Sequence, residues 1–392
     1  MMWTPLHVSL APVARGVRLL LRSLALLAGG GVLLMVTMGC DSGGSGDEAA
    51  PNEAPQAQFS YSPQTPTVGT EVTFDASGAT DPDGSIASYT WTFGDGETRT
   101  GAEVSRTFPE SVENAYGEDA RYEVTLKVTD DEGATATVSK RVRVTPTDRE
   151  VSWEKVWGDE FEGQGLPNSS KWYYETGGDG WGNQERQYYT RDDTDNARVE
   201  DGHLIIEARK ETYQGNAYTS ARLNSEASWK YGRFVARAKV PAGRGTWPAI
   251  WMLPDEQIYG DQYWPDNGEI DIMEHVGYDP GVIHGTIHTE AFNHNDGTDR
   301  GGSLNVPTAT SAFHTYAMEW TPNEIRVFVD GERYFTFRNR EQYGWQEWPF
   351  DQQFHLLLNV AVGGTWGGAE GVDDDAFPER MVIDYVRVYK PE

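Results

Sequence analysis

Short runs of alternating apolar and polar residues fill the first part of the chain that is expected to fold. They include Glu71–Phe74, Ser88–Phe93 and Tyr122–Val128, and clusters of turn-forming residues separate them. Because side chains along a strand point alternately to opposite faces, each run can bury one face and leave the other in water. The pattern predicts a small antiparallel Ig-like β-sandwich over residues 56–146.

The same short period continues through residues 151–392, where no convincing long amphipathic helix interrupts it. Gly, Asp, Asn and Pro separate the runs, as expected of turns between strands. We therefore predict an all-β module, most naturally a jelly-roll sandwich. The supporting runs are His203–Ala208, Gly232–Val240, Val282–Thr289, His314–Trp320, Ile325–Asp330, Phe354–Val362 and Met381–Tyr389.

The N-terminus has a different pattern. Arg15, Arg18 and Arg22 precede the apolar stretch Leu24–Met38. A basic segment followed by an apolar one predicts a signal peptide, here residues 1–39. The apolar stretch is shorter than the roughly 20 residues of a membrane span, so we expect export rather than a transmembrane anchor.

Cys40 follows this leader and is the only cysteine in the chain, which excludes a disulfide framework. Gly39 and Cys40 resemble the end of a bacterial lipoprotein cleavage box, although Thr37 stands where such boxes usually carry Leu. The polar residues 40–55 predict a flexible tether. Two expectations follow: a cell-envelope lipoprotein, in the outer membrane or on the cell surface, that touches the membrane only through its lipid, or a secreted protein with an incidental Cys40.

Charge and composition narrow the choice of partner. The chain has 32 basic and 61 acidic residues, a formal charge of −29, which excludes the basic face that a nucleic-acid binder needs. The same charge repels anionic polymers and suits a neutral one. Twelve of the 14 Trp follow residue 150, where flat side chains could stack on sugar rings.

The most informative segment is Glu269–His275. Glu269 and Asp271 alternate with isoleucines, so on a strand both carboxylates share one face. Regular alternation would place Glu274 in the core, at a cost of several kcal/mol. Either the strand ends at Met273, or a β-bulge returns Glu274 to the acidic face.

With a bulge, three acids would share one concave surface. Crowded carboxylates raise at least one pKa, which leaves one group ionised and another protonated near neutral pH. Retaining glycosidic cleavage needs that division of labour. The alternative is a solvated strand face in an acidic protein. Trp247 and Trp251, four residues apart and hence on one strand face, favour a sugar-binding cleft, although either could instead be a core residue.

The segment Glu269–Glu274 resembles the catalytic signature of glycoside hydrolase family 16, in the bulged form with an extra residue before the last Glu. The likeness covers residues 153–390 and is greatest to the laminarinases, the endo-β-1,3-glucanases of the family. Further matching segments are Trp157–Phe161, Trp181–Glu185, Asp201–Leu204, Thr219–Arg222, Tyr231–Phe234, Gly245–Trp251, His284–Thr289, Asn359–Gly364 and Asp384–Tyr389.

This resemblance implies roles for the acids. Glu269 would be the nucleophile, Glu274 the general acid/base, and Asp271 the residue that hydrogen-bonds Glu269 and balances the charge. No cofactor is implied for catalysis. The resemblance also implies six substrate contacts: Trp247 and Trp251 as stacking platforms, Asn183 and Arg222 on sugar hydroxyls, His288 near the acid/base, and Trp366 at the donor subsites.

Two metals come into question. His284 and His288 have a helical ligand spacing, but strand-forming residues surround them, which disfavours zinc. The family resemblance implies instead a structural calcium held by Glu160, the backbone of Gly202, and Asp384, since Ca²⁺ prefers oxygen ligands. Ordinary surface acids are the alternative explanation of these residues.

The segments Asp81–Ser85, Tyr89–Gly96 and Val124–Gly133 resemble the PKD (polycystic kidney disease) module. Their Asp, Pro and Gly residues fit tight turns better than a calcium loop. In exported polysaccharide-degrading enzymes this family usually serves as a spacer or ancillary contact module, which implies no chemistry here and leaves sugar binding open.

We therefore expect a monomeric, exported, retaining endo-β-1,3-glucanase acting on neutral laminarin-type β-glucan. Two alternatives stay open. One is a related family 16 activity on mixed-linkage β-1,3-1,4-glucan or agar-type galactan. The other is a non-catalytic glucan-binding protein on the same fold, which the presence of both Glu269 and Glu274 disfavours.

Overall fold

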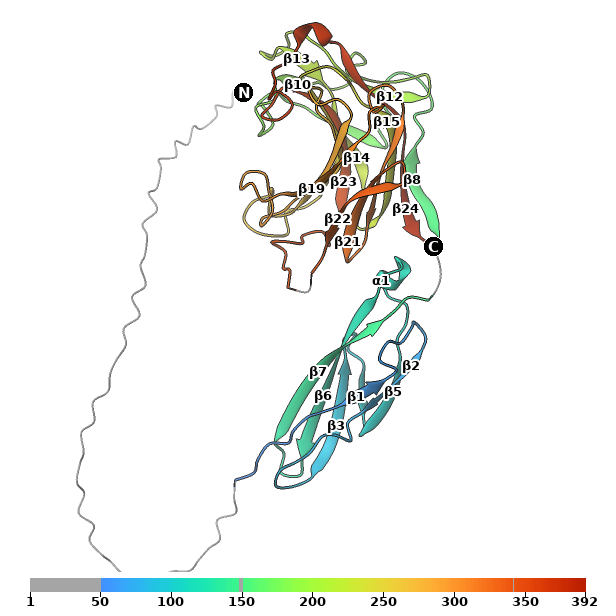
Figure 1. Cartoon of the computed structure of the whole chain (residues 1–392), viewed down its shortest axis with the longest axis vertical. Helices are drawn as coiled ribbons and strands as arrows, with labels where there is room; N and C mark the ends of the chain where they lie inside the picture. Colours follow the sequence, from blue (N-terminus) through green and yellow to red (C-terminus); the bar gives the residue numbers. More distant parts are fainter. Residues whose placement is uncertain (1–50, 148–150, 341) are drawn as a thin grey trace, which may run out of the picture. The chain divides into compact units, whose positions relative to one another are not determined.

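The computed structural model describes residues 51–147, 151–340 and 342–392. The predicted signal peptide, and Cys40 with most of its tether, lie outside the described residues. Within the described ranges, no helix is long and apolar enough to cross a membrane. The predicted all-β fold is confirmed, because the strands form two separate sandwiches and helix is limited to single turns (Figure 1).

The smaller sandwich packs a three-stranded sheet against a four-stranded one. Its core is aromatic: Trp91 is fully buried, packs edge-on against Phe59, and donates its indole N–H to the carbonyl of Gly101. The first sheet contains β1 (Ser60–Ser62), β2 (Glu71–Asp75) and β5 (Glu103–Thr107); the second has the order β4 (Thr98–Thr100), β3 (Ile86–Phe93), β6 (Ala120–Asp130) and β7 (Thr135–Val144), and the single-turn helix α1 is Val112–Ala115.

The larger module begins with an eight-stranded sheet. Seven of its eight strands lie side by side in the order β11 (Ala197–Glu200), β12 (His203–Ala208), β24 (Glu379–Pro391), β15 (Gly232–Lys239), β20 (His314–Trp320), β21 (Glu324–Val329) and β22 (Glu332–Arg338). The eighth, β8 (Trp153–Asp159), pairs with β24. All its neighbouring strands are antiparallel.

A seven-stranded antiparallel sheet forms the second layer (Figure 1). Its order is β19 (Arg300–Asn305), β18 (Val282–His288), β17 (Glu269–Glu274), β16 (Thr246–Pro254), β23 (Phe354–Val362), β14 (Arg222–Trp229) and β9 (Trp172–Glu175). A short parallel pair, β10 (Gln187–Tyr189) and β13 (Tyr218–Ser220), and the 3₁₀ turn η1 (Asp374–Ala376) complete the module.

The core of this module lies between its two sheets. Side chains such as Ile270 and Leu358 from the seven-stranded sheet pack in one cluster with Phe234, Tyr316 and Trp320 from the eight-stranded sheet, all of them 0 or 1% exposed. Because alternate residues of β17 and β23 fill this core, the intervening residues must point to the opposite face of the sheet. That second face carries the candidate site.

Candidate active site

The strand β17 contains the bulge that the sequence left open. Its pairing with β16 joins Ile250 to Met273 but Trp251 to Asp271, so Ile272 has no partner in that ladder. The pairing with β18 shifts between Asp271 and Glu274 as well. Ile272 and Met273 are both buried in the core, and Glu274 returns to the face of the other two acids. The bulge prediction is thus confirmed.

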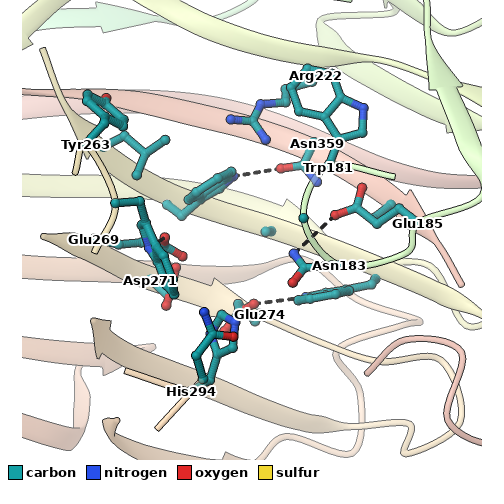
Figure 2. Close-up of a pocket in the computed structure, with 18 residues that line it drawn as sticks. Trp181, Asn183, Glu185, Arg222, Tyr263, Glu269, Asp271, Glu274, His294 and Asn359 are labelled. Atoms are coloured by element: carbon teal, nitrogen blue, oxygen red, sulfur yellow. Dashed lines mark hydrogen bonds between the residues drawn. The ribbon is translucent and has the colours of Figure 1, made fainter. Parts of the chain in front are cut away.

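The three acids line one cavity of about 370 Å³ on the exposed face of the seven-stranded sheet. Figure 2 shows Glu269, Asp271 and Glu274 along one strand, with Arg222 and Trp181 farther across the pocket. The other lining residues are Gly182, Asn183, Glu185, Trp247, Ala249, Trp251, Leu253, Tyr263, Trp264, His294, Asn295, Asn359 and Ala361.

Burial and mutual repulsion raise the proton affinity of all three acids. Burial, followed by the charge of Asp271, raises the pKa of Glu269 to about 8. Burial raises the pKa of Glu274 to about 7, against the opposing hydrogen bond from Trp247. The pKa of Asp271 lies well above its usual value because of burial and of the neighbouring Glu274. The cluster therefore retains protons near neutral pH and titrates as a coupled group.

Each glutamate of the pair accepts a hydrogen bond from an indole. The Nε1 atom of Trp264 lies 2.6 Å from Oε2 of Glu269, and Nε1 of Trp247 lies 2.9 Å from Oε1 of Glu274. An N–H donor fixes the orientation of a carboxylate without supplying a full counter-charge. Trp247, expected as a stacking platform, thus also holds the candidate acid/base.

His288 lies opposite Glu269 in the β17–β18 ladder, and its Nε2 is 3.4 Å from Oδ2 of Asp271. Its ring is 93% buried, since only 7% is exposed. Ligand atoms of His288, Glu269 and Asp271 lie within 4.8 Å of one another, which is close enough to hold a metal. His284 and His288 both lie on the strand β18, as the strand-forming residues around them predicted, so their spacing is not that of two ligands on a helix.

Arg222 is held between two indoles. Its guanidinium carbon lies 4.7 Å from the ring centres of both Trp181 and Trp251, and its Nε lies 2.5 Å from Oε2 of Glu175. Trp251 in turn donates its N–H to Oδ1 of Asn359 at 2.7 Å. Arg222 therefore holds the rings of Trp181 and Trp251 in place, in addition to the sugar contact expected of it.

The two remaining expected sugar contacts have different surroundings. Asn183 lines the cavity, where its Nδ2 lies 3.4 Å from Oε1 of Glu185. Trp366 is outside the set of lining residues and packs edge-on against Trp247, with ring centres 5.4 Å apart. Its contact with the cavity is therefore indirect.

Eleven of the 18 residues that line the cavity were not among the site residues expected from the sequence; five of them are Trp181, Glu185, Tyr263, Trp264 and Asn359. Trp181 and Glu185 belong to the same matching segment as Asn183, so their nearness in sequence to a chosen residue was an available signal. Asn359 of β23 opens another matching segment, Asn359–Gly364, which was an available signal too. Tyr263 and Trp264 had none, because they reach the cavity from the loop before β17 only once the sheet has formed.

The proposed calcium ligands are engaged by arginine. Glu160 forms a two-pronged ion pair with Arg387 at 2.6 Å, which together with Lys155 lowers the pKa of Glu160 to about 2. Asp384 pairs with Arg237 at 2.5 Å. Because a cation already neutralises each carboxylate, these residues as they stand do not fit a Ca²⁺ site.

Two family models match the chain. One, described as glycosyl hydrolases family 16, matches residues 184–387, and one described as PKD domain matches residues 52–146. A curated relative, the beta-glucanase of Rhodothermus marinus, is 62% identical over 250 residues, which is 62% of this chain and 87% of the relative. The chain belongs to glycoside hydrolase family 16.

Solved structures of family 16 proteins agree with this assignment. The laminarinase of Rhodothermus marinus matches with a TM-score of 0.61 at 62% identity, over 62% of this chain and all of that one. A non-specific endo-β-1,3(4)-glucanase, SCLam, matches with a TM-score of 0.59 at 44% identity, over 62% of this chain and 94% of that one. The jelly-roll assignment, the PKD domain and the status of the chain as a glycoside hydrolase rest on these matches together.

Proposed function

We propose that the protein hydrolyses internal β-1,3-glucosidic bonds of laminarin-type glucans with retention of configuration. One observation carries the proposal: Glu269 and Glu274 lie in one cavity with Asp271 between them, and a separate indole N–H holds each glutamate. Two carboxyl groups of unlike protonation at one sugar are the requirement for double displacement. The names of the family 16 relatives support the substrate class.

In the first step, Glu269 attacks the anomeric carbon while the proton of Glu274 passes to the departing glycosidic oxygen. The bond from Glu269 to the sugar forms as the glycosidic bond breaks. A pKa of about 7 keeps Glu274 partly protonated at neutral pH, which suits an acid. In the second step Glu274 takes a proton from water, which attacks the same carbon and releases Glu269.

A pKa of about 8 would leave Glu269 mostly protonated at neutral pH, whereas a nucleophile must be ionised. The protonation state of Asp271 can lower this pKa. Part of that rise comes from the negative charge of Asp271 and from its hydrogen bond with Glu269. Because the pKa of Asp271 is itself well above the usual value, a proton held on Asp271 removes this repulsion and donates to Glu269 instead. We therefore assign the shared proton to Asp271.

Sugar binding is assigned to the floor of the same cavity. Trp251 and Trp181 offer aromatic faces, and Asn183 with Asn359 offers amide groups that bond hydroxyls. Such a surface suits an uncharged polymer, as does the acidity of the chain.

Reducing-end release from laminarin, barley β-glucan and agarose, measured side by side, tests the proposal. We expect laminarin to be cleaved fastest, with the β-anomer appearing first by NMR. Activity on barley glucan is the second candidate, because the SCLam relative is named a non-specific endo-β-1,3(4)-glucanase. Tight laminarin binding with no new reducing ends would establish the glucan-binding alternative instead.

Export as a monomer anchored through lipid on Cys40 is part of the same proposal. The basic-then-apolar leader and the single cysteine after Gly39 support it. A polymer substrate too large to enter a cell also requires an exported enzyme. Mass spectrometry of the mature N-terminus decides: a diacylglyceryl Cys40 supports the anchor, and an unmodified terminus elsewhere rejects it.

Chelation tests the expected calcium. Calcium would have to displace Arg387 from Glu160 and Arg237 from Asp384, so no step of the mechanism is routed through it. An EDTA-induced fall in Tm that Ca²⁺ reverses would restore the expectation. An unchanged Tm would reject the calcium and leave each of the two carboxylates with its arginine.

A further inference from the structure

The bulge of β17 lies against a pair of glycines. Gly285 of β18 and Gly302 of β19 face each other across their ladder. A Cβ atom on Gly285 would stand 2.7 Å from the hydroxyl of Tyr334, and one on Gly302 would stand 2.9 Å from the carbonyl oxygen of Tyr334. Real Cβ contacts are not this close, so the two glycines allow β22 to approach the seven-stranded sheet.

Tyr334 uses that approach to reach the bulge. From β22, in the opposite sheet, its hydroxyl donates to the carbonyl oxygen of Ile272 at 3.3 Å. Ile272 is the residue that the β16 ladder skips. A buried carbonyl near an interrupted ladder needs a partner, because leaving it without one costs about 1–3 kcal/mol. Burial, then the charges of Glu274 and Asp271, raises the pKa of Tyr334, which keeps the hydroxyl protonated as a donor.

We propose that Tyr334 is a positioning residue for catalysis: its hydrogen bond to Ile272 holds the bulge that turns Glu274 into the cavity. The proposal rests on the function proposed above. Without the bulge, strand alternation would direct Met273 to the cleft and Glu274 to the core. Tyr334 touches neither substrate nor reacting atoms, and acts through the backbone two residues before Glu274.

The acid role of Glu274 gives a readout that general damage would not reproduce. Laminarin has a poor leaving group that must be protonated as it departs, whereas a dinitrophenyl β-laminaribioside releases its phenolate without help. A displaced Glu274 should therefore slow laminarin hydrolysis and leave kcat/KM for the aryl glycoside intact, since that constant reports only the formation of the glycosyl-enzyme.

The first variant is Tyr334→Phe in the full chain. We expect kcat on laminarin to fall about five- to tenfold, as loss of one hydrogen bond predicts. KM for laminarin and kcat/KM for the aryl glycoside should stay within twofold of the parent. A laminarin kcat within twofold of the parent overturns the proposal, and so does an equal fall on both substrates.

Tyr316→Phe is the matched control. Tyr316 lies on β20 of the same sheet as Tyr334, is fully buried, and has a hydroxyl without a hydrogen-bond partner among the described residues. The variant removes the same atom from a more deeply buried tyrosine and should change neither substrate's kinetics. A fall on laminarin with this variant would show that the rates respond to any lost core hydroxyl, which contradicts a specific role for Tyr334.

Gly285→Ala approaches the same contact from the other side. Its methyl group would displace the hydroxyl of Tyr334, so we expect a laminarin-specific loss at least as large as that of Tyr334→Phe. The double variant should be no worse than Gly285→Ala alone, because removing the hydroxyl relieves the shortest contact of the new methyl group. Fully additive losses would contradict the proposal. A parent protein inactive on laminarin would instead overturn the proposed function, and this inference with it.

Discussion

The acids of the cleft and those of the eight-stranded sheet differ in what accompanies them. Glu207 and Asp384 on the latter, and Glu160 directly after its strand β8, each pair with an arginine. Glu269 and Glu274 in the cleft instead accept hydrogen bonds from indoles. The pKa is lowered to about 2 at Glu160 and raised to about 8 at Glu269, although both are glutamates of one domain. Partners, rather than residue type, decide which acids can transfer protons.

The largest expected effect tests whether this difference matters for chemistry. Glu269→Gln should lower kcat on laminarin by at least about a thousandfold, because it removes the proposed nucleophile. Glu160→Gln, directly after β8, is the matched control and should retain parental kcat. Reducing-end assays on variants with native circular dichroism provide the measurement. Similar losses in both would erase the distinction between the two groups of acids.

A smaller effect is expected from removing one indole donor. Trp247→Phe should lower kcat about tenfold, because Glu274 loses the bond that orients it. That bond also lowers the pKa of Glu274, so the alkaline limb of kcat/KM should move upward from about pH 7. Trp366→Phe changes a ring that packs on Trp247 without bonding Glu274, and should leave the limb in place.

A third test follows stability rather than rate. The pKa of Asp271 is raised on folding, so the folded state binds more protons than the unfolded chain above pH 4, and the carboxyl destabilises the fold as pH rises. The amide of Asp271→Asn does not titrate. We expect the Tm of this variant, relative to the parent, to increase steadily between about pH 5 and 8. A constant difference would show that Asp271 does not hold its proton.

The smallest effect belongs to the arginine-paired acids. Arg387→Met should destabilise the protein by only about 0.5 kcal/mol at pH 7, since about a third of each side chain is exposed to screening water. The pKa of Glu160 is lowered on folding, so this stability is present above about pH 4.5 and lost as pH falls through about 2. Chemical denaturation of Arg387→Met and of the parent at pH 7 and at pH 2 measures this loss of stability. A difference in unfolding free energy that persists at pH 2 would contradict the ion-pair explanation.

Local patterning predicted most of the fold and the three acids. Residues 203–208 and 232–240 could be predicted as strands from their sequence alone, because side chains on a strand point alternately to its two faces. The Glu269–Glu274 segment left two outcomes, a strand end at Met273 or a bulge, since a buried Glu274 would be too costly; the structure has the bulge. The partners of these acids were beyond such reasoning: Trp264 comes from a loop and Arg387 from the last strand, and their positions depend on tertiary packing.

The indole bonds to Glu269 and Glu274 also make the enzyme its own optical probe. Trp264 and Trp247 each place an emitting ring against a carboxylate that would change charge in the proposed reaction. Indole emission responds to the field and hydrogen bonding around the ring. Fluorescence of the resting protein, followed through a pH titration and compared with Trp264→Phe and Trp247→Phe, would therefore separate the signals of the two glutamates without any substrate.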